Sequence, residues 1–329
     1  MDRGDPVSER YARQVVLPEV GAKGQARIAA THALIVGAGG LGAPVLQYLA
    51  GAGVGMLTIV DPDTIDLSNL HRQTLFAESE AGMAKAEAAT AFVERLNGAI
   101  AVRPVVARLD PANIERLLGG VDIALDCADS FAATYTLSDA CLAAGVPLIS
   151  ASVLGMSGYA GGFCGTAPSI RAVFPDLPDR AATCATAGVL GPVVGLLGSL
   201  QAQMAMAVVL RLAPSPLGRL VQLDGLSLRL GGFRFDGAPE PEAPFRFIAP
   251  SAITDDDFVL ELRSASEAPV PAVSHAHRVP VTGVGAAGPL PQDHPRTVMV
   301  CRSGLRSWQA ARRLRPHWPG EIVLAAMGD

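Results

Sequence analysis

A short apolar stretch that runs into a glycine-rich turn restricts the fold of this chain more than any other feature. In IVGAGGLG, residues 35–42, the spacing of Gly37, Gly39 and Gly42 is G-x-G-x-x-G. A helix-like stretch and a second strand-like stretch ending at Asp61 follow. This order is typical of a βαβ unit in which the glycines let the backbone approach a phosphate and the later acid binds a ribose. The pattern predicts a nucleotide site, although NAD and ATP need the same loop.

The chain repeats this alternation of strand-like and helix-like stretches as far as residue 150. Such alternation favours an α/β fold with a Rossmann-like, mostly parallel sheet. Ligands bind these sheets beyond the carboxyl ends of the strands. The glycine turn, Asp61 and the segment 126–129 each follow a strand-like stretch. We therefore expect these three segments to meet at one edge of the sheet.

Composition divides the 329 residues into four segments. Residues 1–30 resemble a helical arm, and residues 31–236 hold the α/β domain with a glycine-rich strand and a long apolar helix. Four prolines in residues 237–252 favour an extended, semi-rigid linker. Residues 253–329 are left for a short second α/β domain.

Charge and hydropathy narrow the choice of partners and location. The net charge of −5 and the pI of about 5.7 argue against nucleic acid. Residues 181–210 carry no charged side chain, but their glycines, threonines and glutamines favour a buried or interfacial helix over a membrane span. The N-terminus has no apolar signal segment, so we expect a cytoplasmic protein. The mean hydropathy of +0.33 suggests that much surface is buried between subunits.

A dense run of polar residues follows Asp61 at the expected ligand edge. It contains Asp66, Ser68, Asn69, His71, Arg72 and Gln73. An NAD site needs mainly an acid here, whereas a triphosphate site also needs cations and amide donors. A guanidinium can bind phosphate oxygens with two parallel hydrogen bonds. A solvated turn is the alternative reading of this stretch.

Two further residues fit a site for phosphates and a metal. Lys85 lies near the start of a helix-like stretch, where backbone N–H groups favour an anion. Asp129 follows the strand-like DIALDC, where a carboxylate can hold a Mg²⁺ that bridges phosphates. Asp126 could take that role instead, or act as a turn or cap residue.

Together these motifs resemble the ubiquitin-activating-like adenylyltransferases, in particular the MoeB/ThiF group and its branch fused to a rhodanese domain. The resemblance rests on GAGGLG, Asp61, SNLHRQ, the G-x-x-K of residues 82–85 and the D-C-x-D that ends at Asp129, and it covers residues 8 to about 235. Of the two nucleotides considered for the glycine turn, NAD and ATP, the resemblance favours ATP and its cleavage. By this resemblance, the nucleotide, phosphate and Mg²⁺ contacts come from Gly37, Gly39, Gly40, Gly42, Asp61, Ser68, Asn69, Leu70, His71, Arg72, Gln73, Lys85, Asp129 and Ser130.

The resemblance also implies partners and a reaction. Arg13 matches an arginine that reaches across a homodimer into the partner's ATP site. The expected substrate is the C-terminal Gly-Gly carboxylate of a small ubiquitin-like sulfur carrier of the MoaD or ThiS type. This carboxylate would attack the α-phosphate, release pyrophosphate and leave an acyl-adenylate. An NAD-dependent oxidoreductase and a non-catalytic carrier-binding protein with a vestigial rhodanese domain are the alternatives.

One departure from the family concerns zinc. Relatives often carry two C-x-x-C pairs that form a tetrahedral zinc site. The first pair falls on Ser169 and Ala172 here, and the second region, APEPEAPF, has no cysteine. We therefore expect no zinc, and the two segments must be ordered by packing or stay mobile.

Two of the five cysteines match reactive positions in the family. Cys184 precedes the long apolar helix, where some relatives bind the activated carrier or sulfur, and a packing role is the alternative. Cys301 opens CRSGLRS between a strand-like and a helix-like stretch, the layout of a rhodanese loop that holds a persulfide. Arg302 and Arg306 would stabilise its thiolate. Glu261 stands where relatives have an aspartate, and an inactive rhodanese fold is the alternative.

Overall fold

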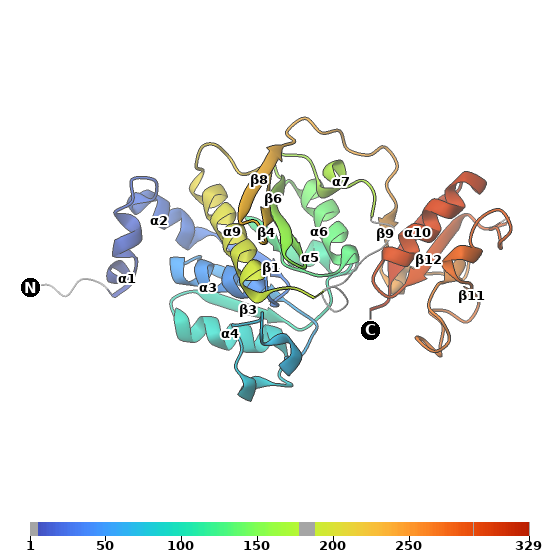
Figure 1. The fold of residues 1–329 in the computed structure, drawn as a ribbon, viewed down its shortest axis with the longest axis horizontal. Helices are drawn as coiled ribbons and strands as arrows, with labels where there is room; N and C mark the ends of the chain where they lie inside the picture. The colour runs from blue at the N-terminus through green and yellow to red at the C-terminus, as the bar shows by residue number, and fades with distance from the viewer. Residues whose placement is uncertain (1–5, 178–187, 292, 329) are drawn as a thin grey trace, which may run out of the picture.

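The computed structural model describes residues 6–177, 188–291 and 293–328, which form two separate sheets (Figure 1). The first sheet has eight strands in the order β3-β2-β1-β4-β5-β6-β7-β8. These strands are β1 (His32–Val36), β2 (Met56–Val60), β3 (Ala101–Val105), β4 (Ile123–Asp126), β5 (Pro147–Leu154), β6 (Ser157–Cys164), β7 (Arg219–Asp224) and β8 (Arg229–Arg234).

Strands β1 to β5 pair in parallel, and β6 to β8 continue the sheet in antiparallel pairs. The expectation of a Rossmann-like, mostly parallel α/β sheet is therefore confirmed. Val36 is in register with Val60 on β2 and with Asp126 on β4. Because these three strands end at the same level, the segments that follow them meet at one edge of the sheet, as expected.

Helices cover both faces of this sheet. The first face carries α2 (Gly21–Ala30), α3 (Gly42–Ala52), α4 (Lys85–Leu96) and α9 (Gly191–Leu210), and the second carries α5 (Ile114–Leu118), α6 (Phe131–Ala144) and α7 (Ile170–Val173). Alternate residues of β1 belong to the two apolar clusters, with Ile35 in one and Leu34 in the other. A central parallel strand is apolar on both sides for this reason. Helix α1 (Pro6–Val15) extends from the first face.

Helix α9 is the one described helix whose length and apolarity would allow it to cross a membrane. It packs against α3, β5 and β6. Its Gln201 is fully buried and donates hydrogen bonds to the carbonyl oxygens of Asp126 and Ile149. A glutamine that satisfies carbonyls at the end of a sheet is typical of a core helix in a folded domain.

The second sheet has five strands in the order β11-β10-β12-β13-β9, all paired in parallel. They are β9 (Arg246–Phe247), β10 (Phe258–Glu261), β11 (His277–Arg278), β12 (Arg296–Cys301) and β13 (Glu321–Ala326), and α10 (Leu305–Leu314) packs on them. Strand β9 lies within the segment 237–252, which is therefore not a linker throughout. The reason is local, since Phe245 and Phe247 interrupt the prolines and Phe247 is buried.

Candidate functional site

The glycine turn joins the end of β1 to the start of α3. Gly37 has a φ of +97°, and a Cβ there would lie 2.6 Å from the carbonyl oxygen of Cys127. A Cβ on Gly42 would overlap the carbonyl oxygen of Gly37. The turn therefore presents backbone at the N-terminus of an 11-residue helix, an arrangement that favours a bound anion.

Asp61 follows β2 and fixes the glycine turn in place. Its carboxylate is buried and accepts hydrogen bonds from the backbone N–H groups of Ala38, at 2.7 Å, and Asp63, at 2.9 Å. Burial raises the pKa of Asp61, and these two N–H groups oppose that shift. A single carboxylate thus joins the turn after β1 to the turn after β2.

The polar run after Asp61 folds back over the glycine turn. Asp66 accepts a hydrogen bond from the N–H of Ser68 at 2.8 Å and starts the short 3-10 helix η1 (Leu67–Asn69). Hydrogen bonds from the Ser68 hydroxyl and, to a lesser extent, from the Ser68 N–H lower the pKa of Asp66. The carbonyl oxygen of Arg72 lies 3.2 Å from where a Cβ on Gly40 would be. The run is therefore a built wall of the site and not only a solvated turn.

Gln73 is the residue in this wall that most directly indicates a ligand site. Gln73 is 4% exposed, and its Nε2 lies 3.4 Å from where a Cβ on Gly39 would be. Its Oε1 is buried and has no hydrogen-bond partner among the residues that the structure describes. Because buried polar atoms are almost always paired, an unpaired acceptor beside a glycine turn fits a site that is completed by a ligand.

Lys85 is placed by a neighbour that the sequence pattern did not single out. Its ammonium group is buried and lies 2.9 Å from Oδ2 of Asp63, while the N–H of Lys85 donates to the carbonyl oxygen of Asp63. Asp63 is itself mostly exposed, with 64% of its side chain accessible. Lys85 begins α4, so its charge lies at a helix N-terminus beside Asp61. This cation is held at the ligand edge by a partner that solvent or an anion can reach.

The two acids after β4 differ in environment, and this separates the alternatives for a metal ligand. Asp126 is fully buried and accepts hydrogen bonds from Ser150 Oγ, at 2.8 Å, and the N–H of Ala128, at 3.2 Å. Burial raises its pKa to about 6. Asp129 is exposed at the sheet edge, and Ser130 precedes α6 without capping it. Asp129 is thus the acid that a Mg²⁺ with phosphates and water could reach.

The buried Asp126 predicts a pH-dependent stability. Since its folded pKa of about 6 is above the ordinary value of 3.8, its contribution is fully present at low pH and is lost as pH rises through 6. We expect Asp126→Asn to gain about 2 kcal/mol relative to the parent protein between pH 4.5 and pH 8. Urea unfolding of both proteins at both pH values measures this difference, and parallel pH profiles would contradict it.

Arg13 lies away from these groups within its own chain. Around it on α1, Tyr11 Oη accepts from Asn97 and Gln14 donates to the carbonyl oxygen of Ala52. Ala52 and Asn97 mark the ends of α3 and α4 opposite the glycine turn and Lys85. The exposed Arg13 can therefore reach a site of this kind only on another molecule.

The segments that would share zinc in relatives are joined here by other contacts. Ser169 donates from its N–H and its Oγ to the two carboxylate oxygens of Glu240, both at 2.6 Å. Nearby, the buried Arg171 makes two hydrogen bonds to Asp139 and lies over the ring of Tyr135. Hydroxyl, methyl and carboxylate groups do not form a four-thiolate zinc site, so the residues present do not fit that metal.

Loss of the Arg171–Asp139 pair should destabilise this region. Asp139→Asn leaves a buried guanidinium without its anion, which costs about 2–3 kcal/mol after allowance for the exposed part of Asp139. Asp176→Asn, on an exposed acid of the same segment, is the matched control and should change stability little. Chemical unfolding of the two variants measures the difference. Equal stability of both would show that the pair contributes nothing.

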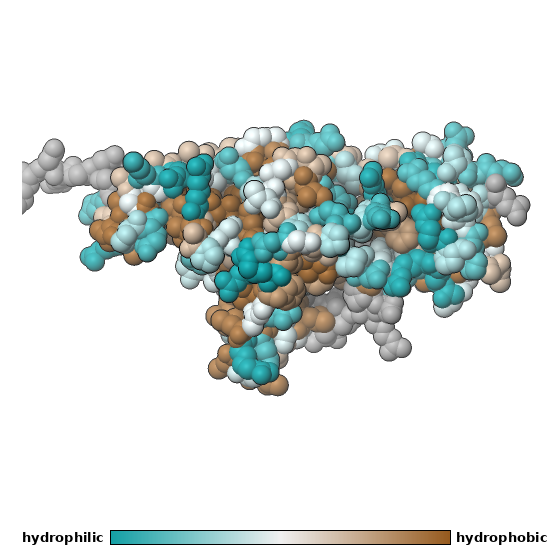
Figure 2. All heavy atoms as spheres, turned by 90° about the horizontal axis from the view of Figure 1, so that it is seen from above, coloured by the Kyte–Doolittle hydropathy of each residue, from teal (hydrophilic) through white to brown (hydrophobic). Residues whose placement is uncertain are grey.

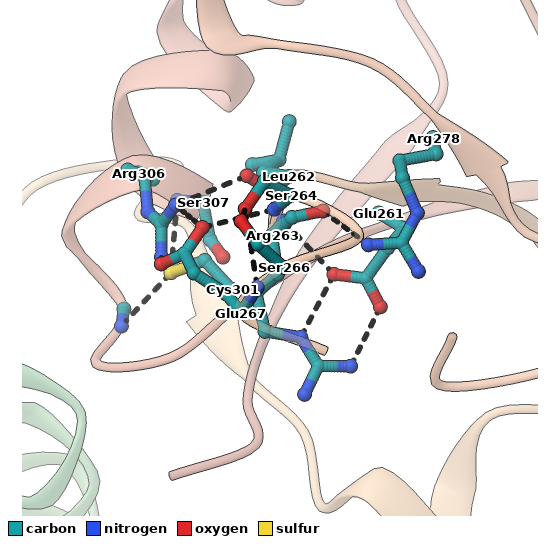
Figure 3. A network of polar contacts seen from close by, with 11 residues as sticks. Glu261, Leu262, Arg263, Ser264, Ser266, Glu267, Arg278, Cys301, Arg306 and Ser307 are labelled. Atoms are coloured by element: carbon teal, nitrogen blue, oxygen red, sulfur yellow. Dashed lines mark hydrogen bonds and ion pairs between the residues drawn. The ribbon is translucent and has the colours of Figure 1, made fainter. Parts of the chain in front are cut away.

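The eight-stranded sheet with its helices forms a first unit, and the five-stranded sheet with α10 forms a second unit. In the second unit, the Cys301 loop follows β12. Cys301 is buried, and its Sγ accepts hydrogen bonds from the N–H groups of Gly304, at 3.1 Å, and Ser307, at 3.3 Å. Figure 3 shows this sulfur beside Arg306, whose guanidinium makes two hydrogen bonds to Glu267. These bonds lower the pKa of Glu267 to about 2. Two N–H groups at the start of α10 provide a cradle for an anionic sulfur.

The stretch 258–267 contacts the Cys301 loop, since Arg306 donates hydrogen bonds to Glu267 and to the carbonyl oxygen of Leu262. Glu261 is buried and binds Arg263 through both carboxylate oxygens, at 2.9 and 2.6 Å (Figure 3). It also accepts a hydrogen bond from the N–H of Ala272. Glutamate at this position therefore orders the loop after β10. Cys184, the other reactive candidate, lies outside the described residues.

Sequence reasoning missed three residues that organise these sites. Asp63 forms an ion pair with Lys85, and Gln201 donates a hydrogen bond to the carbonyl oxygen of Asp126 at the end of β4. Glu240 accepts hydrogen bonds from Ser169. Each acts through a contact between distant segments, and only Gln201 carried a local signal, as an amide inside an apolar helix. The expected residues from the glycine turn, the 66–73 run, Lys85 and Asp129 all lie at the sheet edge, whereas Arg13 does not.

Comparison with known proteins agrees with this geometry. The model of the ThiF family matches residues 11–244. The chain belongs to the ThiF family. The SAMP-activating enzyme E1 of Haloferax volcanii is 40% identical over 222 residues, which cover 67% of this chain and 82% of that protein. The adenylyltransferase and sulfurtransferase MOCS3 of Bos taurus is 46% identical over 233 residues, which cover 68% of this chain and 50% of that one.

The fold of this ThiF-family protein also occurs in solved structures. E. coli MccB, solved with ATP, has a TM-score of 0.61 at 22% identity, covering 70% of this chain and 72% of that one. This similarity concerns the fold alone. The chain spans about half the length of the MOCS3 and UBA4 relatives that it matches.

Proposed function

We propose that this protein adenylates the C-terminal Gly-Gly carboxylate of a small ubiquitin-like sulfur carrier with ATP and Mg²⁺ in the cytoplasm. The proposal rests on one observation: the glycine turn, the 66–73 wall, Lys85 and Asp129 come together at one sheet edge. Within that wall, the buried Gln73 Oε1 has no partner among the described residues. An NAD-dependent oxidoreductase would share only the glycine turn. A carrier-binding protein without activity would not need this set of charged groups.

ATP fits the residues that line this edge. The glycine turn has no room for side chains at Gly37 and Gly42, which suits close approach of phosphates to backbone. Asp61 has acceptor positions left for a ribose hydroxyl, and Gln73 Oε1 is available to accept a hydrogen bond from the ligand. Ser68, Asn69 and Arg72 would bind phosphate oxygens from the wall, and Asp129 would hold Mg²⁺. The metal would neutralise phosphate charge when bound.

This chain's residues would then act mainly by screening charge and positioning. A carboxylate and a triphosphate repel each other, so Arg72 and Lys85 must neutralise the phosphates before the two groups meet. Lys85 can turn from Asp63 toward a phosphate because Asp63 faces solvent. The carrier carboxylate attacks the α-phosphorus, the bond to the β-phosphate oxygen breaks and pyrophosphate leaves. The product is the carrier acyl-adenylate.

A homodimer would complete the site. Arg13 cannot serve the glycine turn of its own chain, and an arginine supplied from a partner can accelerate such a transfer by roughly 10³ or more. Exposed apolar side chains are available for association on the arm, α3 and around the start of α9, namely Val16, Leu17, Tyr48, Leu190 and Leu196. In the face shown in Figure 2, apolar residues gather over the first unit, while the second unit is mainly hydrophilic.

The Cys301 loop supports a sulfurtransferase role for the second unit, which we assign as a short rhodanese-like domain of residues 253–329 with β9 added to its sheet. The N–H groups of Gly304 and Ser307 would hold the terminal sulfur of a Cys301 persulfide as an anion. Arg302 and Arg306 add positive charge. A vestigial domain would not need to retain this cradle.

The first experiment is the intact mass of a purified MoaD-type or ThiS-type carrier after incubation with this protein, ATP and Mg²⁺. We expect a carrier adenylate, which becomes a thiocarboxylate when thiosulfate and a dithiol are added. Adenylate without thiocarboxylate would leave an activator with a silent second domain. The absence of adenylate with every carrier, although the carriers bind, would favour the non-catalytic alternative.

A further inference from the structure

The Cys301 loop packs directly against the adenylation unit, next to the segment that carries Asp129. A Cβ on Gly304 would lie 3.4 Å from Cβ of Ala132 and 2.7 Å from the ring of Phe247. Ala132 is the second residue of α6 and comes three residues after Asp129. In Figure 3 a green segment of the first unit accordingly lies beside the Cys301 loop. The loop after β12 therefore faces the loop after β4.

A second contact joins the same two edges. The N–H of Met327 donates to the carbonyl oxygen of Cys301, and the N–H of Gly328 donates to that of Arg302. These bonds hold Gly328 beside the Cys301 loop, where a Cβ would overlap the guanidinium of Arg108. Arg108 follows β3, so it too comes from the carboxyl edge of the large sheet. The two sheets thus meet through the ends at which each carries its reactive groups.

The interface is packed with apolar side chains. Phe247, Cys301 and Trp308 belong to the same buried cluster as Tyr135 and Leu137 of α6. The partly buried Phe131, Ala132 and Leu305 pack on this cluster. An interface with a continuous apolar core holds two units in one arrangement better than a polar contact does.

We propose that Cys301 delivers sulfur to the adenylation site of its own chain, across this packed interface and without displacement of the second unit. The inference rests on the proposed function. The contacts through Gly304 and Ala132 limit the separation of Cys301 Sγ and the Asp129 Cα to roughly 22 Å, given standard backbone dimensions. An extended carrier tail gains about 3.3–3.6 Å per residue. About six or seven tail residues therefore let the acyl-adenylate end of the carrier move from the nucleotide edge to Cys301 while the second unit stays in place.

The Cys301 thiolate attacks the sulfane sulfur of thiosulfate, forms a persulfide and releases sulfite. The terminal persulfide sulfur attacks the acyl-adenylate carbonyl, a carbon–sulfur bond forms, the carbon–oxygen bond to AMP breaks and AMP leaves. A dithiol then attacks Cys301 Sγ of the resulting acyl disulfide and releases the carrier thiocarboxylate. The second thiol of the dithiol closes its own disulfide and restores the Cys301 thiolate.

Mixed chains test delivery within one chain. A Lys85→Ala chain and a Cys301→Ser chain, separately tagged, are co-expressed and the species containing both is purified. It retains one adenylation site and one Cys301, but on different chains. With carrier, MgATP, thiosulfate and dithiothreitol we expect adenylate at about half the wild-type rate and thiocarboxylate at less than a twentieth. Thiocarboxylate at a quarter of the wild-type rate or more would overturn the inference.

Wedge variants give an independent measurement. Ala132→Arg places a long side chain between α6 and Gly304, whereas Ala143→Arg places it on the exposed end of the same helix. We expect both variants to keep ATP–pyrophosphate exchange and Cys301 persulfide formation within about twofold of wild type. Thiocarboxylate formation should fall at least tenfold in Ala132→Arg alone. Equal thiocarboxylate yields would overturn the inference, whereas absence of adenylate from the wild type would instead overturn the proposed function and remove the basis of the inference.

Discussion

Replacement of Lys85 by alanine should lower carrier-dependent ATP–pyrophosphate exchange by about 10²–10³-fold, the usual cost of removing one preorganised charge or donor from such a site. Lys85 is buried at the start of α4 with Asp63 as its anion, 2.9 Å away. No other lysine lies near this edge, because the chain has only one more, Lys23. Exchange of radiolabelled pyrophosphate into ATP measures the effect directly.

The chain offers matched controls for this experiment. Lys23→Ala removes the other lysine from an exposed site on α2 and should leave exchange unchanged. Asp63→Asn keeps Lys85 but removes its anion, so we expect the KM for ATP to change more than kcat. If Lys85→Ala exchanges at the wild-type rate while folded, Lys85 has no part in the reaction.

The sequence predicts the ligand edge well because the features that create it are local. A glycine turn after one strand, an acid after the next and a polar run all follow from residue spacing. In a parallel sheet the strand ends must then coincide, as the register of Val36 with Val60 and Asp126 shows. The roles of Asp126 and Asp129 could not be separated in this way. Their difference is one of burial, and burial depends on Ser150 and α9.

The junction between the two units is the part that spacing could not predict. Four prolines in residues 237–252 favoured a linker. Phe247 in this segment nevertheless belongs to strand β9, which pairs with β13, and its ring contacts Gly304 in the Cys301 loop. Glu240 likewise binds Ser169, which lies 71 positions earlier. These contacts join segments that are distant in the chain, and no local periodicity encodes them.

Gly42→Ala should have the largest effect on stability. A Cβ at Gly42 would overlap the carbonyl oxygen of Gly37, which is backbone and cannot move aside cheaply. We expect a loss of about 3 kcal/mol or more, as for overpacking combined with backbone strain. The displaced turn should also lose ATP binding, since its N–H groups would no longer converge on the phosphates.

Gly51→Ala is the matched control for Gly42→Ala because both glycines belong to α3. At Gly51 a Cβ meets no atom of the described residues within 4 Å, and Gly51 is exposed. Alanine there should stabilise the protein by about 0.5–1 kcal/mol through its higher helix propensity. Urea unfolding and ATP titration of both variants should therefore give changes of opposite sign in stability and a loss of ATP binding in Gly42→Ala alone. If the two variants had similar stability and similar ATP binding, the turn would tolerate a side chain at Gly42. The hypothesis that phosphates approach the backbone closely there would then be wrong.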